Sequence, residues 1–199
     1  MLLIFVLGCV ACATEPSSDQ VNASSTSSMI EDGPTTFDPF VHKSPGEHEI
    51  EIVVDGESRS YKLLVPDSFD PDQPSAMVLA FHGWTMSPDQ MVRGAWHRLS
   101  QESGFLLVAP AGLDSEWAVA HDEAEALSAL PDSTATLTDF PAGDRDVLFA
   151  SLVLSELNEY FLIDQSRVYV TGESLGGWMA SRVACDLGGQ ITALGATYN

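Results

Sequence analysis

The sequence predicts an α/β fold: a mostly parallel sheet with helices on both faces and an antiparallel hairpin at its start. Short, continuous apolar runs such as 77–81 (MVLAF) and 105–109 (FLLVA) are typical of strands buried on both faces. Between such runs lie segments like 144–161, whose apolar residues recur at spacings of three and four. Strands that alternate with helices in this way favour a parallel sheet.

The chain divides into three parts by composition. Residues 1–13 are expected to be an export signal, residues 14–39 a flexible polar tether rich in Ser, Thr, Asp and Pro, and residues 40–199 an incomplete α/β domain. The apolar run 2–13 (LLIFVLGCVACA) is shorter than the roughly 20 residues that span a bilayer. It therefore indicates export and not a membrane-spanning helix.

Two export routes stay open. Ala11-Cys12-Ala13 offers a small-residue cleavage site, which predicts a secreted protein. Residues 6–9 (VLGC) are similar to a lipobox, which predicts a cell-surface lipoprotein anchored to the membrane through lipidated Cys9. A buried N-terminal helix is a third interpretation, and the polar stretch after residue 13 argues against it.

The elements of the domain follow one another in a regular order. An Asp-Gly pair at 55–56 joins two β-rich segments, 48–54 and 60–65, which is a strong hairpin signal. We expect helices over 88–102, 144–161 and 175–187, and further strands over 77–81, 105–109, 167–171 and 191–196. Ser87-Pro88 provides a cap and first position for the first helix, and Gly104 ends it.

Residues 113–142 interrupt this alternation. They are acidic, rich in Ala, Ser and Thr, and contain Trp117. We interpret them as a long surface excursion with a short helix near 122–130.

The charge of the chain excludes one class of partner. With 29 acidic against 8 basic residues, the formal net charge is −21. Such a polyanion repels phosphate backbones, so we expect no nucleic acid partner and a neutral substrate. The scattered histidines form no metal-ligand spacing, and no phosphate loop or dinucleotide fingerprint appears, so we expect no metal and no cofactor.

The motif with the most chemical content is Gly172-Glu173-Ser174-Leu175-Gly176. An apolar strand precedes it and a helix with an apolar face follows it, as a nucleophile elbow requires. Gly172 and Gly176 would make room for a strained turn that projects the Ser174 hydroxyl, and the Leu175 N–H would face an oxyanion. In the alternative interpretation, Ser174 is merely the N-cap of the helix.

A second motif, His82-Gly83-Trp84, follows the strand 77–81. At this place we expect a loop that completes the oxyanion hole. The backbone N–H of Trp84 is the expected second donor, with Thr85 as the near alternative. His82 and Gly83 are expected to support the loop, and an ordinary turn is the alternative interpretation.

From about residue 61 onward the chain resembles the secreted polyhydroxybutyrate depolymerase and feruloyl esterase branch of the α/β-hydrolases. The matching segments are YKLLVP, MVLAFHGW, GFLLVAPAG, DRDVLF and IDQSRVYVTGESLGGWMASRVAC. The resemblance implies a serine carboxylic-ester hydrolase that forms an acyl-enzyme on polyester or on hydroxycinnamoyl-polysaccharide esters. It makes Ser174 the nucleophile and Asp146 a structural acid ahead of its helix.

The family's catalytic Asp and His follow the Ser in the chain. After Ser174 this sequence has one acidic residue, Asp186, and no histidine. Asp186 lies late on the helix that leaves the elbow, so we assign it no catalytic role. The chain is therefore interpreted as a fragment of a longer esterase, inactive by itself, with strand 191–196 left as an edge. Cys185 is then either a buried free thiol or a cysteine separated from its disulfide partner.

Two other hypotheses stay open. One is a non-catalytic surface lipoprotein that binds polymer or glycan on exposed tryptophans, for which the candidates are Trp84, Trp96, Trp117 and Trp178. The other is an acyl hydrolase completed in trans by a separately encoded C-terminal half. His42, His48 and His97 precede the elbow in peripheral segments and are poor substitutes for the missing base.

Overall fold

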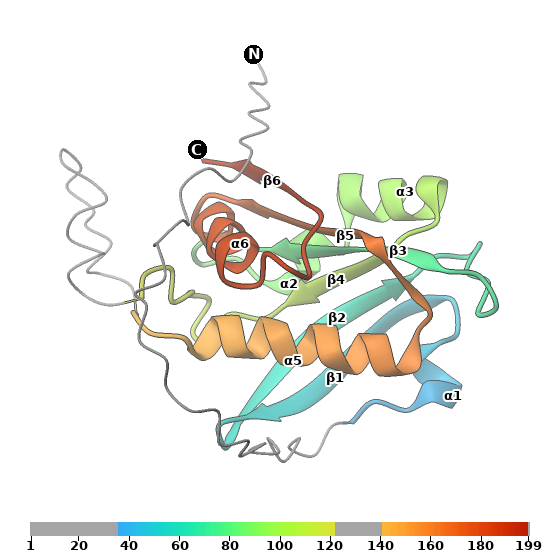
Figure 1. Cartoon of the computed structure of the whole chain (residues 1–199), viewed down its shortest axis with the longest axis horizontal. Coiled ribbons are helices and arrows are strands. Elements are labelled where there is room, and N and C mark those ends of the chain that lie inside the picture. Colours follow the sequence, from blue (N-terminus) through green and yellow to red (C-terminus); the bar gives the residue numbers. More distant parts are fainter. Residues whose placement is uncertain (1–35, 122–140, 199) are drawn as a thin grey trace, which may run out of the picture.

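A computed structural model describes residues 36–121 and 141–198 of the chain, and six strands in these residues form one mixed sheet (Figure 1). The strands lie in the order β1-β2-β4-β3-β5-β6. Their bounds are Gly46–Val54 (β1), Glu57–Val65 (β2), Ser75–Phe81 (β3), Leu106–Pro110 (β4), Ile163–Glu173 (β5) and Ala193–Thr197 (β6). The helices are Pro39–His42 (α1), Pro88–Met91 (α2), Gly94–Ser103 (α3), Arg145–Tyr160 (α5) and Leu175–Asp186 (α6).

The sheet begins with the predicted hairpin. β1 and β2 pair antiparallel from Val54 and Glu57 outward, and the turn residues Asp55 and Gly56 have φ of 50° and 82°. β2 pairs antiparallel with β4, whereas β4, β3, β5 and β6 pair in parallel. The predicted fold class is thus confirmed.

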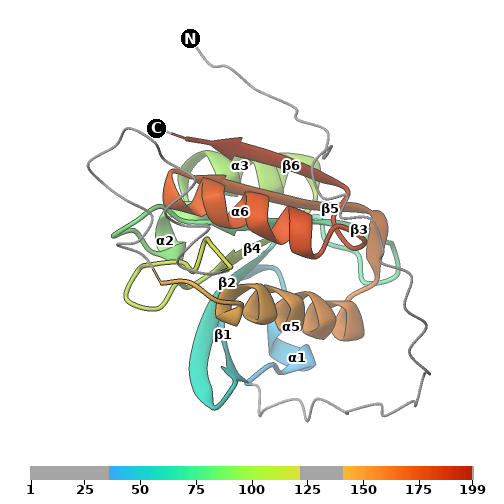
Figure 2. The ribbon, with the colours of Figure 1, turned by 60° about the vertical axis from the view of Figure 1, so that its left-hand side comes forward.

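Helices cover both faces of the sheet (Figure 2). α5 and α6 pack on one face and bury the larger apolar cluster, which includes Phe149, Leu154 and Met179. α2 and α3 lie on the other face, where Met91 and Trp96 pack against the smaller cluster around Val78 and Leu107. Because both faces are covered, the central strands are apolar throughout, as their sequences indicate.

The prediction of one continuous helix over 88–102 was wrong, because the structure has two helices there, α2 and α3. The capped start is present, since the Ser87 N–H donates to the Gln90 side chain at 2.9 Å, but α2 ends at Met91. Arg93 is extended and Gly94 has φ of 64°, a conformation that glycine adopts without strain and that breaks the helix. α3 then runs to the predicted stop, Gly104, which caps it at φ of 71°.

Two boundaries differ from expectation. The packed fold reaches back to Phe37, which is buried and stacks on Tyr160 at 4.3 Å between ring centroids. Residues 113–121 are also not a surface excursion, because Trp117, Ala118 and Ala120 are buried. The predicted helix near 122–130, the export signal and the tether up to residue 35 lie outside the described residues.

The topology creates one position suited to a site. β3 and β5 are neighbours in the sheet, but the chain leaves β3 toward α2 and α3 on one face and leaves β5 toward α6 on the other. The two loops therefore diverge at the carboxyl ends of β3 and β5, which is where open α/β sheets bind ligands. Residues 82–85 and Ser174 lie in these two loops.

No helix within the described residues is long and apolar enough to cross a bilayer.

Candidate active site

The corner between β5 and α6 is formed by Ser174. β5 ends at Glu173, α6 begins at Leu175, and Ser174 has φ of 53° and ψ of −122°. Residues other than glycine rarely adopt this conformation, and the strain is of the order of 1–3 kcal/mol. Such strain persists only where the surroundings hold it, and it is concentrated at functional sites.

The flanking glycines are required by backbone packing. A Cβ built on Gly172 would lie 2.0 Å from the carbonyl oxygen of Gly176, and one on Gly176 would lie 2.1 Å from that of Phe81. Both distances are far below van der Waals contact, so the corner closes only with glycine at both positions.

Backbone hydrogen bonds hold Ser174 in place. Its N–H donates to the carbonyl of Thr197 on β6 at 2.8 Å, and its carbonyl accepts from the Gly177 N–H at 2.9 Å. The half-buried side chain of Ser174 makes no capping hydrogen bond to α6. This absence argues against the alternative that Ser174 merely caps the helix, because a Ser N-cap accepts from the first turn.

Leu175 is the first residue of α6, so its N–H has no acceptor within the helix. The positive end of the helix dipole lies at the same place. Both features would stabilise negative charge that develops on an oxygen beside Ser174.

The loop after β3 lies against this corner. Phe81 pairs with Gly172 in the sheet register, so residues 82–84 run beside Glu173 and Ser174. A Cβ built on Gly83 would lie 3.6 Å from the Cβ of Ser174 and 3.3 Å from the carbonyl oxygen of Glu173. The backbone of the predicted oxyanion loop therefore lies beside the candidate nucleophile.

His82 lies beneath this loop and holds it. Its Nε2 accepts from the Gly112 N–H at 3.0 Å, and its Nδ1 lies 2.8 Å from the carbonyl of Gly83. Since Nε2 accepts, we assign the proton to Nδ1. Burial lowers the pKa of His82, which agrees with a neutral ring.

Thr85 and Trp84 differ in how they are held. The Thr85 N–H donates to the Ser115 carbonyl at 3.3 Å, so it is engaged away from Ser174. The Trp84 side chain is 55% exposed, and its Nε1–H donates to the Glu116 carboxylate at 3.3 Å.

Trp117 supports the same loop from below. It is fully buried, packs edge-on against Phe81, and donates its Nε1–H to the His82 carbonyl at 2.8 Å. This support was not expected, because the sequence analysis placed Trp117 in an acidic surface segment. Its position after the family segment GFLLVAPAG is the feature of the sequence that could have indicated it.

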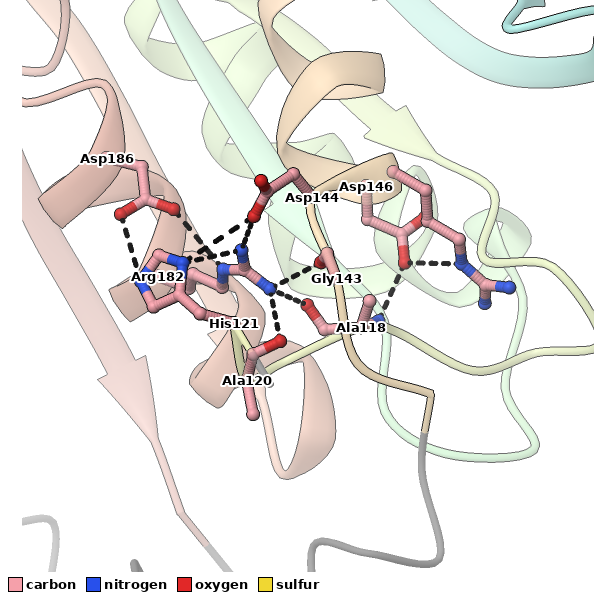
Figure 3. Close-up of polar contacts among 9 residues, drawn as sticks. Ala118, Ala120, His121, Gly143, Asp144, Asp146, Arg182 and Asp186 are labelled. Carbon is pink, nitrogen blue, oxygen red and sulfur yellow. Dashed lines mark hydrogen bonds and ion pairs between the residues drawn. The ribbon is translucent and has the colours of Figure 1, made fainter. Parts of the chain in front are cut away.

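Arg182 joins residues 118–121 and residues 143–144 to α6 (Figure 3). One terminal nitrogen of its buried guanidinium donates to the carbonyls of Ala118, Ala120 and Gly143 at 2.9, 2.7 and 2.7 Å. The other lies 2.5 Å from the Asp144 carboxylate and 3.0 Å from His121 Nδ1. An arginine within the apolar run LGGWMASRVAC was the sequence signal for such a buried role.

A second buried ion pair lies alongside. Asp146, in the first turn of α5, binds the Arg59 guanidinium at 2.7 Å. It also accepts from the Ala118 N–H at 2.7 Å (Figure 3). The Arg59 guanidinium also lies over the Phe149 ring, 4.2 Å from its centroid. Asp146 therefore anchors residue 118, which agrees with the expected structural role.

Among the described residues, no hydrogen bond or ion pair links a histidine to Ser174. His121 lies near Asp144 and Asp186 at 3.6 and 3.5 Å. Asp186 also pairs with Arg182 at 3.3 Å, and it lies twelve residues after Ser174, roughly 18 Å along the helix axis. No group of three or more potential metal ligands occurs within residues 36–121 and 141–198.

Comparison with solved structures agrees with this fold. A solved acetyl xylan esterase from Aspergillus awamori superposes with a TM-score of 0.53 at 20% identity, covering 68% of this chain and 45% of that one. A likeness at this identity shows the fold. The chain has the α/β-hydrolase fold.

The sequence relatives of this chain carry the names of esterases. A putative esterase, NocK, from Nocardia uniformis is 35% identical over 140 residues, covering 68% of this chain and 36% of the relative. A probable feruloyl esterase C from Aspergillus niger is 24% identical over 155 residues, covering 75% of this chain and 47% of the relative. The predicted resemblance to feruloyl esterases is confirmed, and the polyhydroxybutyrate depolymerase branch stays a prediction. No family model matches the chain.

The chain spans less than half the length of either of these two relatives.

Proposed function

We propose that the chain carries the nucleophile and oxyanion-hole half of a serine carboxylic-ester hydrolase. The observation that carries the proposal is the strained conformation of Ser174, φ of 53° and ψ of −122°, beside the Gly83 backbone. Ser174 attacks the ester carbonyl and releases the alcohol, forming an acyl-enzyme that water then hydrolyses. The N–H groups of Leu175 and Trp84 donate to the oxyanion.

The base and its orienting acid come from outside the residues described above. Support for this comes from His82, which is buried with both ring nitrogens engaged, and from the position of His121 near the far end of α6. Without a base a serine hydroxyl is a weak nucleophile, so the 199-residue chain by itself is expected to be nearly inactive. A segment encoded after residue 199, or a second chain, would supply the base.

The substrates proposed are esters of plant polysaccharide, in which hydroxycinnamoyl or acetyl groups are linked to sugar hydroxyls. The names of the relatives, feruloyl esterase and bifunctional acetylxylan esterase/xylanase, support this class. Polyesters are the second substrate class. The apolar run 2–13 supports export to the cell exterior, as a secreted or lipid-anchored protein.

The test is p-nitrophenyl acetate hydrolysis together with labelling by a fluorophosphonate probe. Wild-type chain, its Ser174→Ala variant, and the chain extended by the coding sequence that follows codon 199 are compared. We expect Ser174 to be the labelled residue, and the extended protein to be faster by on the order of 10³-fold or more. Equal rates for extended wild type and extended Ser174→Ala would contradict the proposal and favour a non-catalytic binding protein.

A further inference from the structure

The 112–116 segment forms a strained turn beside the oxyanion loop. Asp114 and Ser115 have φ of 53° and 62°, and the Glu116 N–H donates to the Leu113 carbonyl at 2.9 Å. Two successive positive φ values are the pattern of a type I′ turn, which glycine and asparagine favour. A Cβ built on Gly112 would lie 2.4 Å from the Glu116 carbonyl oxygen, so the turn is also tightly closed.

The strained turn positions Glu116 beside the oxyanion loop. Thr85, also at positive φ of 61°, donates its N–H to Ser115, and Trp84 donates its Nε1–H to Glu116. Two hydrogen bonds thus connect the turn to the loop that lies beside Ser174. Strain that is maintained at a site is an indication of function.

Trp84 and Glu116 offer a particular pair of surfaces. The indole follows Gly83 directly and is 55% exposed. The partly exposed carboxylate beside it is an acceptor-only group when ionised. An aromatic face next to a hydrogen-bond acceptor suits a sugar ring, which has apolar C–H faces and hydroxyl donors at its edge.

We infer that Trp84 and Glu116 form a specificity-determining pair that holds the alcohol part of the ester through stacking on Trp84 and hydroxyl donation to Glu116. This inference rests on the proposed function, and it assigns residues to the choice between the two substrate classes. A polyester chain presents carbonyl acceptors and no hydroxyl donors between its ends, so Glu116 would face acceptors without a proton between them. The pair therefore selects sugar alcohols against polyesters.

The net charge of −21 disfavours a different class, anionic esters. Anionic esters are repelled by the whole chain and by Glu116 locally. A neutral sugar avoids both costs.

The test measures binding without turnover, in the full-length Ser174→Ala protein. The probes are xylotetraose and a linear trimer of 3-hydroxybutyrate with both ends blocked. Their binding is measured by calorimetry and by NMR of the indole N–H signals. Trp84→Ala is expected to weaken xylotetraose binding at least tenfold, and Glu116→Gln at least threefold. The matched controls are Trp96→Phe and Glu102→Gln, both on α3 across the sheet, and they should bind as the parent does.

Three outcomes would overturn the pair: no xylotetraose binding at 20 mM, unchanged binding in Trp84→Ala, or trimer binding as tight as that of xylotetraose. A shift of the Trp84 indole signal on adding xylotetraose, lost in Glu116→Gln, would support it. If Ser174 is unreactive in the labelling experiment while xylotetraose binds through Trp84, then the esterase proposal fails and the sugar-binding pair stands.

Discussion

Gly83 and Ser174 lie side by side across the β3–β5 boundary, so close that a Cβ built on Gly83 would lie 3.6 Å from the Ser174 Cβ. Their closeness depends on the Phe81–Gly172 register, which brings the ends of the two parallel strands level. Two loops that leave the sheet toward opposite faces thereby meet at one point.

The glycines of the corner should differ sharply in their tolerance of alanine. Gly172→Ala and Gly176→Ala place a methyl 2.0 and 2.1 Å from backbone carbonyl oxygens, so each should lower the free energy of unfolding by about 3 kcal/mol or more. Gly189 is the matched control, because a Cβ there meets nothing within 4 Å, and alanine should change stability by less than about 0.5 kcal/mol. Urea unfolding of the three variants measures their free energies of unfolding. Equal values would show that the corner has room for a methyl group at residues 172 and 176.

Gly83→Ala should separate stability from reactivity. The new methyl would lie 2.9 Å from the flexible Met86 Sδ and 3.3 Å from the Glu173 carbonyl oxygen, a closeness that small shifts relieve. We therefore expect a loss of stability of only about 1 kcal/mol, but a displaced oxyanion loop and at least tenfold slower labelling of Ser174 in the extended protein. Unchanged labelling would mean that the 82–84 loop does not contribute to the oxyanion hole.

Arg182→Met should be among the most destabilising single changes. It leaves the carbonyls of Ala118, Ala120 and Gly143 without their donor and removes the partner of Asp186, so we expect a loss of about 3 kcal/mol. The control is Arg98→Met on α3, whose exposed pairing with Glu102 at 3.8 Å should contribute less than about 0.5 kcal/mol. Thermal unfolding measures both, and a small effect of Arg182→Met would show that the carbonyls find other donors.

Local patterns in the sequence predicted most of the fold. The apolar runs at 77–81 and 105–109 and the Asp-Gly pair at 55–56 each became the expected element, because burial on both faces and positive φ leave a direct mark on composition. The break between α2 and α3 left a weaker mark. One Gly94 within a helical pattern is usually tolerated, and only the packing of Met91 and Val92 into the smaller cluster fixes the break there.

The site divides in the same way. Ser174, Gly172 and Gly176 are adjacent in sequence, so the motif alone places them together, and the structure adds the steric reason for both glycines. The contacts of Trp117 with His82, of Arg182 with Ala118 and of Glu116 with Trp84 join residues 32 to 64 positions apart. No local periodicity encodes such pairings, because they depend on how an irregular segment lies over the sheet.

His82 should make stability depend on pH. Burial lowers its pKa in the folded protein, against weaker raising effects of Gly83 and Asp146, so the unfolded chain binds the proton more readily. Its contribution to stability is therefore complete above the unfolded pKa of about 6.5 and is lost as the pH falls from there through the lower folded pKa.

His82→Gln removes this titration. The free energy of unfolding of the variant should vary less steeply with pH between about 5 and 7 than that of wild type. His42, whose pKa burial also lowers, leaves a residual slope in both proteins. Parallel urea titrations measure the difference, and identical slopes would show that His82 does not lose proton affinity on folding.

The last prediction concerns the strain stored at Ser174. Ser174→Ala removes the hydroxyl and keeps a Cβ at φ of 53°, whereas Ser174→Gly removes the hydroxyl and also the steric conflict. Glycine is normally less stable than alanine at a regular position by roughly 0.5–1 kcal/mol, because its unfolded chain has more freedom. At residue 174 the order should reverse, with Ser174→Gly more stable than Ser174→Ala by about 1 kcal/mol in urea unfolding. The reversal would mean that the fold holds residue 174 in a conformation that is costly for any side chain. Such a conformation is expected where the backbone must place a reactive hydroxyl. If alanine is the more stable of the two, the corner is relaxed and the argument from strain to a nucleophile is lost.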